Sequence, residues 1–124
     1  MLTDTRLTTT TAEITLRDDG IAVFATLPDK RDDITLSDVK EIDILIDSFR
    51  DTHRLYLVVI KHGRYTLEAR KHLSRKEGIA DKIAMVAKGP TQTMLGNFFL
   101  GIYRPKIAIR LFHSAQEAER WLLS

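Results

Sequence analysis

The residues best placed to do chemistry lie in the turn Gly89-Pro90-Thr91-Gln92-Thr93, which follows a buried strand pattern and opens an apolar helix. Helix N-termini present free backbone amides, and in open α/β sheets these gather where strands end and can hold an anion. The spacing GxxxxGK[ST] is absent, so this is not a P-loop. Two interpretations stay open: a plain capped turn, or a site for a small anionic or amphipathic ligand. The ligand-binding candidates are Lys88, Thr91, Thr93, Arg104 and Lys106.

No other group of residues has the pattern of a catalytic or metal-binding site. The four histidines lack metal-ligand spacing, and the absence of cysteine removes thiolate ligands and thiol nucleophiles. Asp43, Asp47 and Asp51 recur every four residues, as on the solvated face of a helix. His62 and Thr66 flank one turn, but no third group is available to orient them as base and nucleophile. We therefore predict a protein that is not an enzyme and has no cofactor and no bound metal.

The segment 94–103 predicts a helix that is apolar on nearly every side, with Asn97 almost its only polar residue. A helix that covers one face of a sheet normally keeps a polar outer stripe. A second subunit, a lipid or acyl ligand, or neighbouring elements of the core should therefore cover this helix, and Gly96 and Gly101 would permit close approach. We predict a homodimer with the interface residues Met94, Leu95, Phe98, Phe99, Ile102 and Tyr103.

Composition and charge limit the possible partners. The chain of 124 residues is 44% hydrophobic and 29% charged, as in soluble domains. Residues 1–60 carry 7 basic and 12 acidic side chains, whereas residues 61–110 carry 11 basic and 3 acidic ones. The basic half suits an anionic partner, or is simply the basic face of a small fold. Nucleic acid is not expected, because the basic residues are not interleaved with aromatic platforms and no helix-turn-helix pattern occurs.

The hydropathy pattern also bears on location. No window reaches 18 apolar residues, so we predict no transmembrane segment. The threonine-rich start lacks the apolar region of a signal peptide, so we expect a cytoplasmic protein.

Strand and helix patterns alternate along the chain and predict an α/β fold. The turn Asp18-Asp19-Gly20 joins two alternating strands, and the aliphatic run 55–60 is typical of a strand buried on both faces. The order ββαβαβαβα predicts a single domain over 1–124, with a five-stranded mixed sheet, right-handed crossovers, and residues 1–10 as a flexible N-terminal extension. The expected strands are 11–17, 21–27, 55–60, 82–87 and 107–112, and the expected helices start near residues 37, 66, 90 and 114.

Four motifs carry a resemblance to a known family. They are Thr66-Leu-Glu-Ala-Arg-Lys-His-Leu, Lys82-Ile-Ala-Met-Val-Ala-Lys, Gly96-Asn-Phe-Phe-Leu-Gly-Ile-Tyr-Arg-Pro-Lys, and the closing Leu111-Phe-His-Ser-Ala-Gln-Glu-Ala-Glu-Arg-Trp-Leu. From Ile34 to its end, the chain resembles small bacterial proteins of the SpoIIAA-like, or STAS/Sec14-like, α/β fold. The resemblance covers about three quarters of the chain, and most such proteins have no assigned activity.

The resemblance implies a non-catalytic regulatory or protein-interaction module with a possible protein partner. Anti-sigma-factor antagonists of the related STAS fold carry a phosphorylatable serine where the helix after the core strand begins. Here the serine and its aspartate are missing, and Thr66 is the residue that could stand in as phospho-acceptor. The Sec14-like resemblance implies an apolar ligand, for which a chain this short would need a dimer interface.

Overall fold

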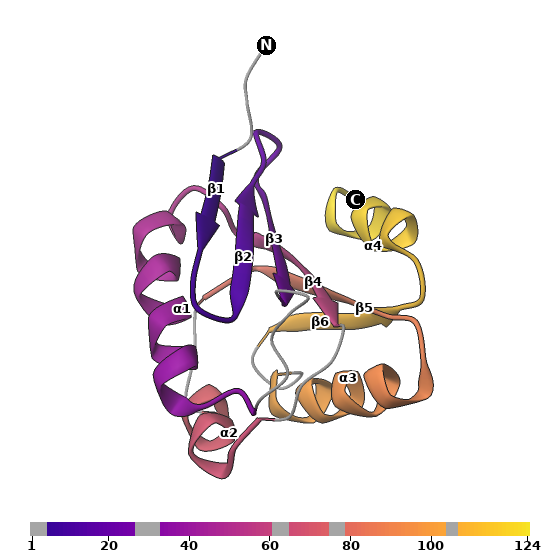
Figure 1. The fold of residues 1–124 in the computed structure, drawn as a ribbon. Helices are drawn as coiled ribbons and strands as arrows, with labels where there is room; N and C mark the ends of the chain where they lie inside the picture. The colour runs from indigo at the N-terminus through magenta and orange to yellow at the C-terminus, as the bar shows by residue number, and fades with distance from the viewer. Residues whose placement is uncertain (1–4, 27–32, 61–64, 75–78, 104–106) are drawn as a thin grey trace.

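The fold is a six-stranded sheet with helices on both faces, as a computed structural model shows (Figure 1). The structure describes residues 5–26, 33–60, 65–74, 79–103 and 107–124. The strands are β1 (Thr5–Thr8), β2 (Ala12–Leu16), β3 (Ile21–Thr26), β4 (Leu55–Ile60), β5 (Lys82–Ala87) and β6 (Ala108–Phe112). The helices are α1 (Leu36–Phe49), α2 (Leu67–Ser74), α3 (Pro90–Tyr103) and α4 (Ala115–Leu122).

The strands lie in the sheet in the same order as in the chain. The pairs β1–β2 and β2–β3 are antiparallel, and the pairs β3–β4, β4–β5 and β5–β6 are parallel. The antiparallel turn between β2 and β3 depends on Gly20, whose φ of +90° an L side chain rarely adopts. The predicted mixed, largely parallel α/β sheet is confirmed.

The predicted strand count was wrong by one, because residues 5–8 were assigned to a flexible extension. They form the edge strand β1, in which Thr5 pairs with Leu16 and Leu7 with Ile14. Leu7 packs against the main core, and the backbone amide of Thr10 donates to the Glu41 carboxylate on α1. Strand pairing with β2 and these long-range contacts therefore order residues 5–8, although their sequence shows little alternation of apolar and polar residues.

Side-chain caps fix where three of the helices begin. Thr35 and Asp38 form a capping box at the start of α1, and the Asp38 carboxylate accepts from the Thr35 amide at 2.9 Å. The Ser114 hydroxyl accepts from the Glu117 amide at the start of α4. At the start of α2, the Thr66 hydroxyl accepts from the Ala69 amide at 3.2 Å. These bonds satisfy amides that have no partner inside the helix.

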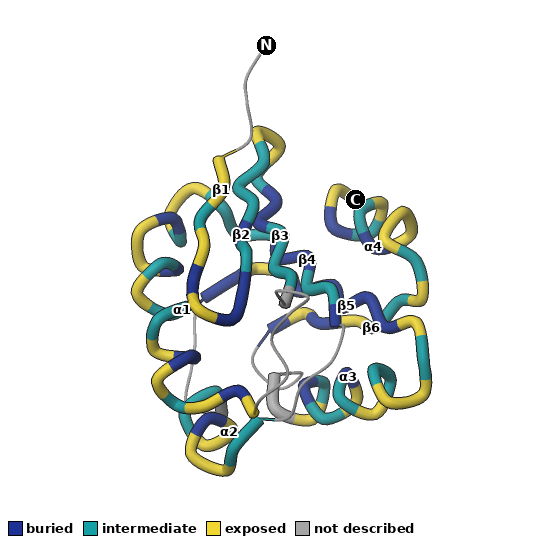
Figure 2. Tube along the Cα trace, in the orientation of Figure 1, coloured by how far each residue is buried: buried dark blue, intermediate teal, exposed yellow. Residues whose placement is uncertain are grey.

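The sheet buries apolar side chains on both faces. Figure 2 shows buried residues along the central strands β4 and β5. Helices α1, α2 and α3 cover one face, where Tyr56 and Ile60 of β4 belong to the main core. Helix α4 covers the other face, where Leu57 packs with Leu122. The Arg17–Glu119 ion pair at 2.7 Å holds α4 against the β2–β3 hairpin. Strand β4 is thus buried on both faces, as the run of aliphatic residues predicted.

Candidate functional site

Helix α3 lies close against the sheet because it places a glycine at the contact. An ideal Cβ on Gly96 would lie 2.8 Å from Leu111 Cδ1 and 3.4 Å from Ile60 Cδ1, so a larger residue would require the Leu111 side chain or the helix to shift. One turn later, the Phe99 ring packs edge-to-face on Tyr65 at a centroid distance of 5.2 Å. The face of α3 that carries Gly96 and Phe99 therefore belongs to the core of this chain.

The opposite side of α3 is exposed and carries no charge. We call this surface the α3 stripe; its residues are Pro90, Thr91, Met94, Asn97 and Gly101. Met94 is 74% exposed, and a Cβ on Gly101 would have no neighbour within 4 Å. The exposed surfaces of α1, α2 and α4 each include charged residues, so α3 differs from the other three helices.

The structure separates the predicted interface residues into four groups. Met94 is exposed, and Leu95 and Phe98 are half-buried, with the Arg70 guanidinium carbon 5.5 Å from the centre of the Phe98 ring. Assigning Phe99 to an interface was wrong, because it is 8% exposed and sits in the core beside Tyr65. The side chains of Ile102 and Tyr103 lie outside the described residues.

Two residues in the first turn of α3, Gln92 and Thr93, contact Gly89 in the turn before the helix. Gln92 is the third residue of the helix, and its Oε1 lies 2.6 Å from where a Cβ on Gly89 would be. The amide of Thr93 donates to the Gly89 carbonyl at 2.8 Å. Lys88 and Thr91 are exposed beside this turn, and Arg104 and Lys106 lie outside the described residues. Binding of an anionic or amphipathic ligand here stays a prediction.

The predicted phospho-acceptor, Thr66, has a structural role at the start of α2. Its hydroxyl caps the helix through the Ala69 amide, and its own amide donates to the Ile34 carbonyl at 3.0 Å. Modification of this hydroxyl stays a prediction, and it would replace an existing cap.

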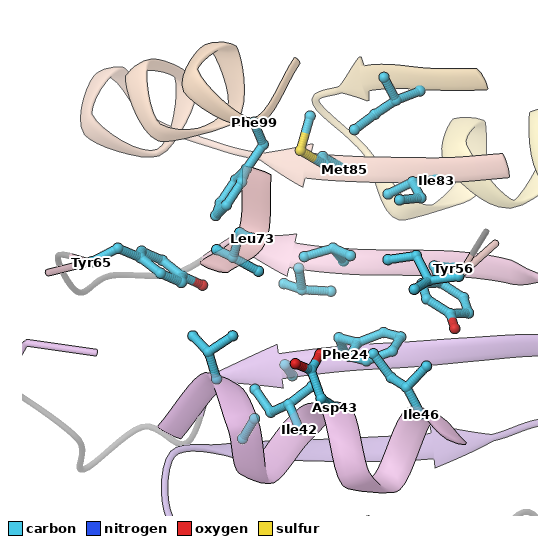
Figure 3. Close-up of a pocket in the computed structure, with 17 residues that line it drawn as sticks. Phe24, Ile42, Asp43, Ile46, Tyr56, Tyr65, Leu73, Ile83, Met85 and Phe99 are labelled. Atoms are coloured by element: carbon cyan, nitrogen blue, oxygen red, sulfur yellow. The ribbon is translucent and has the colours of Figure 1, made fainter. Parts of the chain in front are cut away.

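A pocket of about 140 Å³ lies between the sheet and helices α1, α2 and α3 (Figure 3). We call it the helix-side pocket. Its lining is mostly aliphatic and aromatic, with Phe24 from β3, Ile46 from α1, Met85 from β5 and Phe99 from α3 among the contributing residues. The Phe24 ring also packs on the Tyr56 ring, with 4.8 Å between centroids. Apolar surface of this kind suits an apolar ligand.

Three of the lining residues carry a polar group, namely Tyr56, Tyr65 and Asp43, although the Tyr56 hydroxyl oxygen itself is buried. Burial raises the pKa of Tyr65 to about 12. Burial also raises the pKa of Tyr56 to about 12, although the nearby charges of Arg54 and Arg50 oppose this effect. Both phenols are therefore neutral hydrogen-bond donors at physiological pH.

Asp43 is not the solvated residue that the four-residue spacing predicted. Its side chain is 15% exposed and hydrogen-bonds to His72 Nε2 on α2, whereas Asp47, one turn later, is 66% exposed. Asp43 is buried because α2 packs over this part of α1, whereas α2 does not cover the next turn, which carries Asp47. The pocket was not predicted from the sequence. One signal within the aliphatic run of β4 was Tyr56, a hydroxyl-bearing residue in a strand expected to be buried on both faces.

Comparisons with known proteins identify the family. The model of a domain of unknown function, DUF7793, matches residues 14–124. The chain belongs to this family. The chain is also similar to the crystal structure of an uncharacterised protein from Shewanella loihica PV-4, which belongs to the DUF3478 family and has a SpoIIAA-like fold. The similarity covers 98% of this chain and 97% of that chain, with 15% sequence identity and a TM-score of 0.61. The SpoIIAA-like fold expected from the sequence is thus confirmed. No curated protein matches the chain.

Within the described ranges, no helix is both long enough and apolar enough to span a bilayer. In the part of the chain that the structure describes, no group of three or more His, Asp or Glu side chains could hold a metal ion.

Proposed function

We propose that this DUF7793 domain is a non-catalytic regulatory or protein-interaction module that forms a homodimer through the α3 stripe. The observation that carries the proposal is the lack of charge on this exposed surface, together with the 74% exposure of Met94. Charged residues are depleted at the centres of protein interfaces, and methionine is enriched there. The cytoplasmic location stays part of the same proposal.

The shape of the stripe also supports a contact between two copies. Gly101 leaves open space around its α-carbon, so a second helix can approach the backbone closely at this point. In a dimer with two-fold symmetry, the same patch from each subunit meets its copy. A charge placed at Met94 would then face an identical charge, and such a juxtaposition costs several kcal/mol.

The test compares Met94→Asp with the matched control Ile44→Asp. Ile44 lies on α1 and is 70% exposed, so both substitutions place a carboxylate on a similarly open helix surface. We expect light scattering after size-exclusion chromatography to give a dimer mass for the wild type and for Ile44→Asp. Met94→Asp should give the monomer mass with an unchanged unfolding temperature.

Two results would contradict the dimer. One is a wild-type protein that stays monomeric at several hundred micromolar, because a dimer that dissociates at this concentration would not form at ordinary cellular concentrations. The other is a dimer that Met94→Asp leaves intact, which would place the contact on another surface.

A further inference from the structure

Strand β6 forms an open edge of the sheet. It is the last strand in the sheet order, so β5 pairs with one of its edges, and no strand among the described residues pairs with the other. Figure 1 shows this strand with α3 below it and α4 above it. An edge strand presents a row of backbone N–H and C=O groups without strand partners. The outer edge of β6 can therefore accept a further strand.

An arginine occupies the middle of this edge strand. Arg110 is exposed, and its guanidinium carbon lies 5.3 Å from the centre of the Phe112 ring and 5.7 Å from the centre of the Trp121 ring. Trp121 is itself held by Lys82, whose Nζ lies 5.3 Å from the ring centre and donates to the Trp121 carbonyl at 3.2 Å. Both ring contacts are within the range of cation–π attraction, so they fix the position of the guanidinium.

The charge of Arg110 is not paired within the described part of the domain. Among the described residues, no carboxylate lies within ion-pair distance of its guanidinium. By contrast, the Arg17 guanidinium lies 2.7 Å from the Glu119 carboxylate. A planar guanidinium that is already held in place can bind an incoming carboxylate through two N–H donors. Charge complementarity therefore assigns an acidic side chain to the molecule that covers this edge.

The two faces of β6 define the neighbours of that acidic side chain. Successive side chains of a strand point to opposite faces, so Arg110 lies on the α4 face, and Ile109 and Leu111 pack in the core on the α3 face. Directly opposite residues of two paired strands share a face. An added strand would thus place an acidic residue beside Arg110. The residues before and after it would extend the apolar surface beside Ile109 and Leu111.

We propose that the β6 edge binds an extended segment of a partner protein in which an acidic residue lies between two apolar ones. The segment joins the sheet as a further strand. Its main chain provides affinity, and the carboxylate opposite Arg110 provides selectivity. A second copy of β6 suits the edge less well, because full antiparallel overlap places Arg110 opposite itself, and like charges directly opposite destabilise a sheet. The site is independent of the proposed dimer, which uses the α3 stripe.

Two synthetic peptides that differ at one position isolate the role of the carboxylate. Both are acetylated and amidated and have the sequence Thr-Val-X-Val-Thr, with glutamate or glutamine at X. In titrations followed by amide chemical shifts, we expect both to shift β6 most strongly and the glutamate peptide to bind about five-fold more tightly. This ratio corresponds to about 1 kcal/mol, the upper value for an exposed ion pair. The bound peptide should also slow hydrogen exchange of the β6 amides that point away from β5.

Two variants test the arginine. Arg110→Gln should bind the two peptides with equal affinity. Arg120→Gln is the matched control, because it removes an exposed positive charge from α4, and the five-fold preference should persist there. Thermal unfolding checks that both variants are folded.

Two modified peptides test strand addition itself. Successive amides of an added strand point alternately toward β6 and toward solvent. A methyl group on the glutamate amide and a methyl group on the amide of the next valine should therefore have opposite effects. One of the two peptides should lose binding, and the other should bind almost as tightly as the unmodified peptide.

Several outcomes would overturn the proposal. If neither peptide binds the wild type up to its solubility limit, Arg110 only keeps the edge from pairing with other chains. Equal affinities in the wild type, or a preference that survives in Arg110→Gln, would remove the carboxylate from recognition. Equal effects of the two methyl groups would exclude strand addition, and slow exchange of the outer β6 amides in the free protein would assign the edge to a second copy. Met94→Asp should bind the peptides as the wild type does, so failure of the dimer would leave this proposal standing.

Discussion

Two glycines of α3 provide a direct measure of how tightly that helix packs. Gly101 is exposed, and a Cβ added there would meet nothing within 4 Å. Gly96 is buried, and its added Cβ would lie 2.8 Å from Leu111 Cδ1. Both lie inside one helix with ordinary negative φ, so alanine suits the backbone equally at both positions. The two substitutions differ in what the new methyl group touches.

The expected free energies follow from that difference. Alanine at position 101 should stabilise the domain by about 0.5–1 kcal/mol, since glycine costs that much in a helix interior and loses more entropy on folding. Alanine at position 96 has the same gain, but crowding against Leu111 and Ile60 costs about 1–3 kcal/mol. Gly96→Ala should therefore range from neutral to about 2.5 kcal/mol destabilising. The two variants should differ by about 1–3 kcal/mol.

Urea unfolding of the wild type and both variants measures this difference. The protein should be dilute enough to be monomeric, because dimer formation adds to apparent stability. Equal urea dependence of the free energy would show that the compactness of the two states is unchanged. If Gly96→Ala stabilises the domain as much as Gly101→Ala does, the side chains of Leu111 and Ile60 do not crowd position 96, and the close packing inferred there is wrong.

Two further predictions concern titration and anion binding. The pKa of Tyr65, raised from 10 to about 12, keeps it neutral when the unfolded chain ionises. The contribution of Tyr65 to stability should thus fall by up to about 3 kcal/mol as pH rises from about 10 to about 12. Tyr65→Phe should lessen the total fall in urea unfolding, and an unchanged pH dependence would contradict burial of the phenol. If Lys88 and Thr91 hold an anion, inorganic phosphate should raise the unfolding temperature and Lys88→Ala should abolish the rise; no rise in the wild type would exclude the site.

Local patterns in the sequence were enough to predict most of the fold. The aliphatic run 55–60 could be assigned to a two-sided buried strand, and Thr35 or Ser37 to the start of α1, because both signals lie within a few residues. Strand β1 could not be predicted in the same way. Its order depends on pairing with Ile14 and Leu16 and on the bond between Thr10 and Glu41, which are 31 residues apart.

The sequence predicted much less of the candidate site, because the pocket is a product of packing between elements. Asp43 and Asp47 are four residues apart on one helix and look equivalent in the sequence. The arrival of His72 from α2, 29 residues away, buries the first and leaves the second in solvent. Likewise, no group among the described residues pairs with the Tyr56 hydroxyl, and this results from the packing of distant elements, which no local spacing in the sequence reveals.

The apolar character of α3 suggested an interface, and the structure explains much of it differently. Phe99 belongs to the core, and Arg70 covers part of Phe98. On the stripe itself, Met94 is the one large apolar side chain that is mostly exposed. Stable dimers bury about 800 Å² per subunit, and this surface offers few anchors for such an area. The missing charges therefore support a contact here more than the exposed hydrophobic area does. A dimer formed here should be weak, with dissociation constants in the micromolar range.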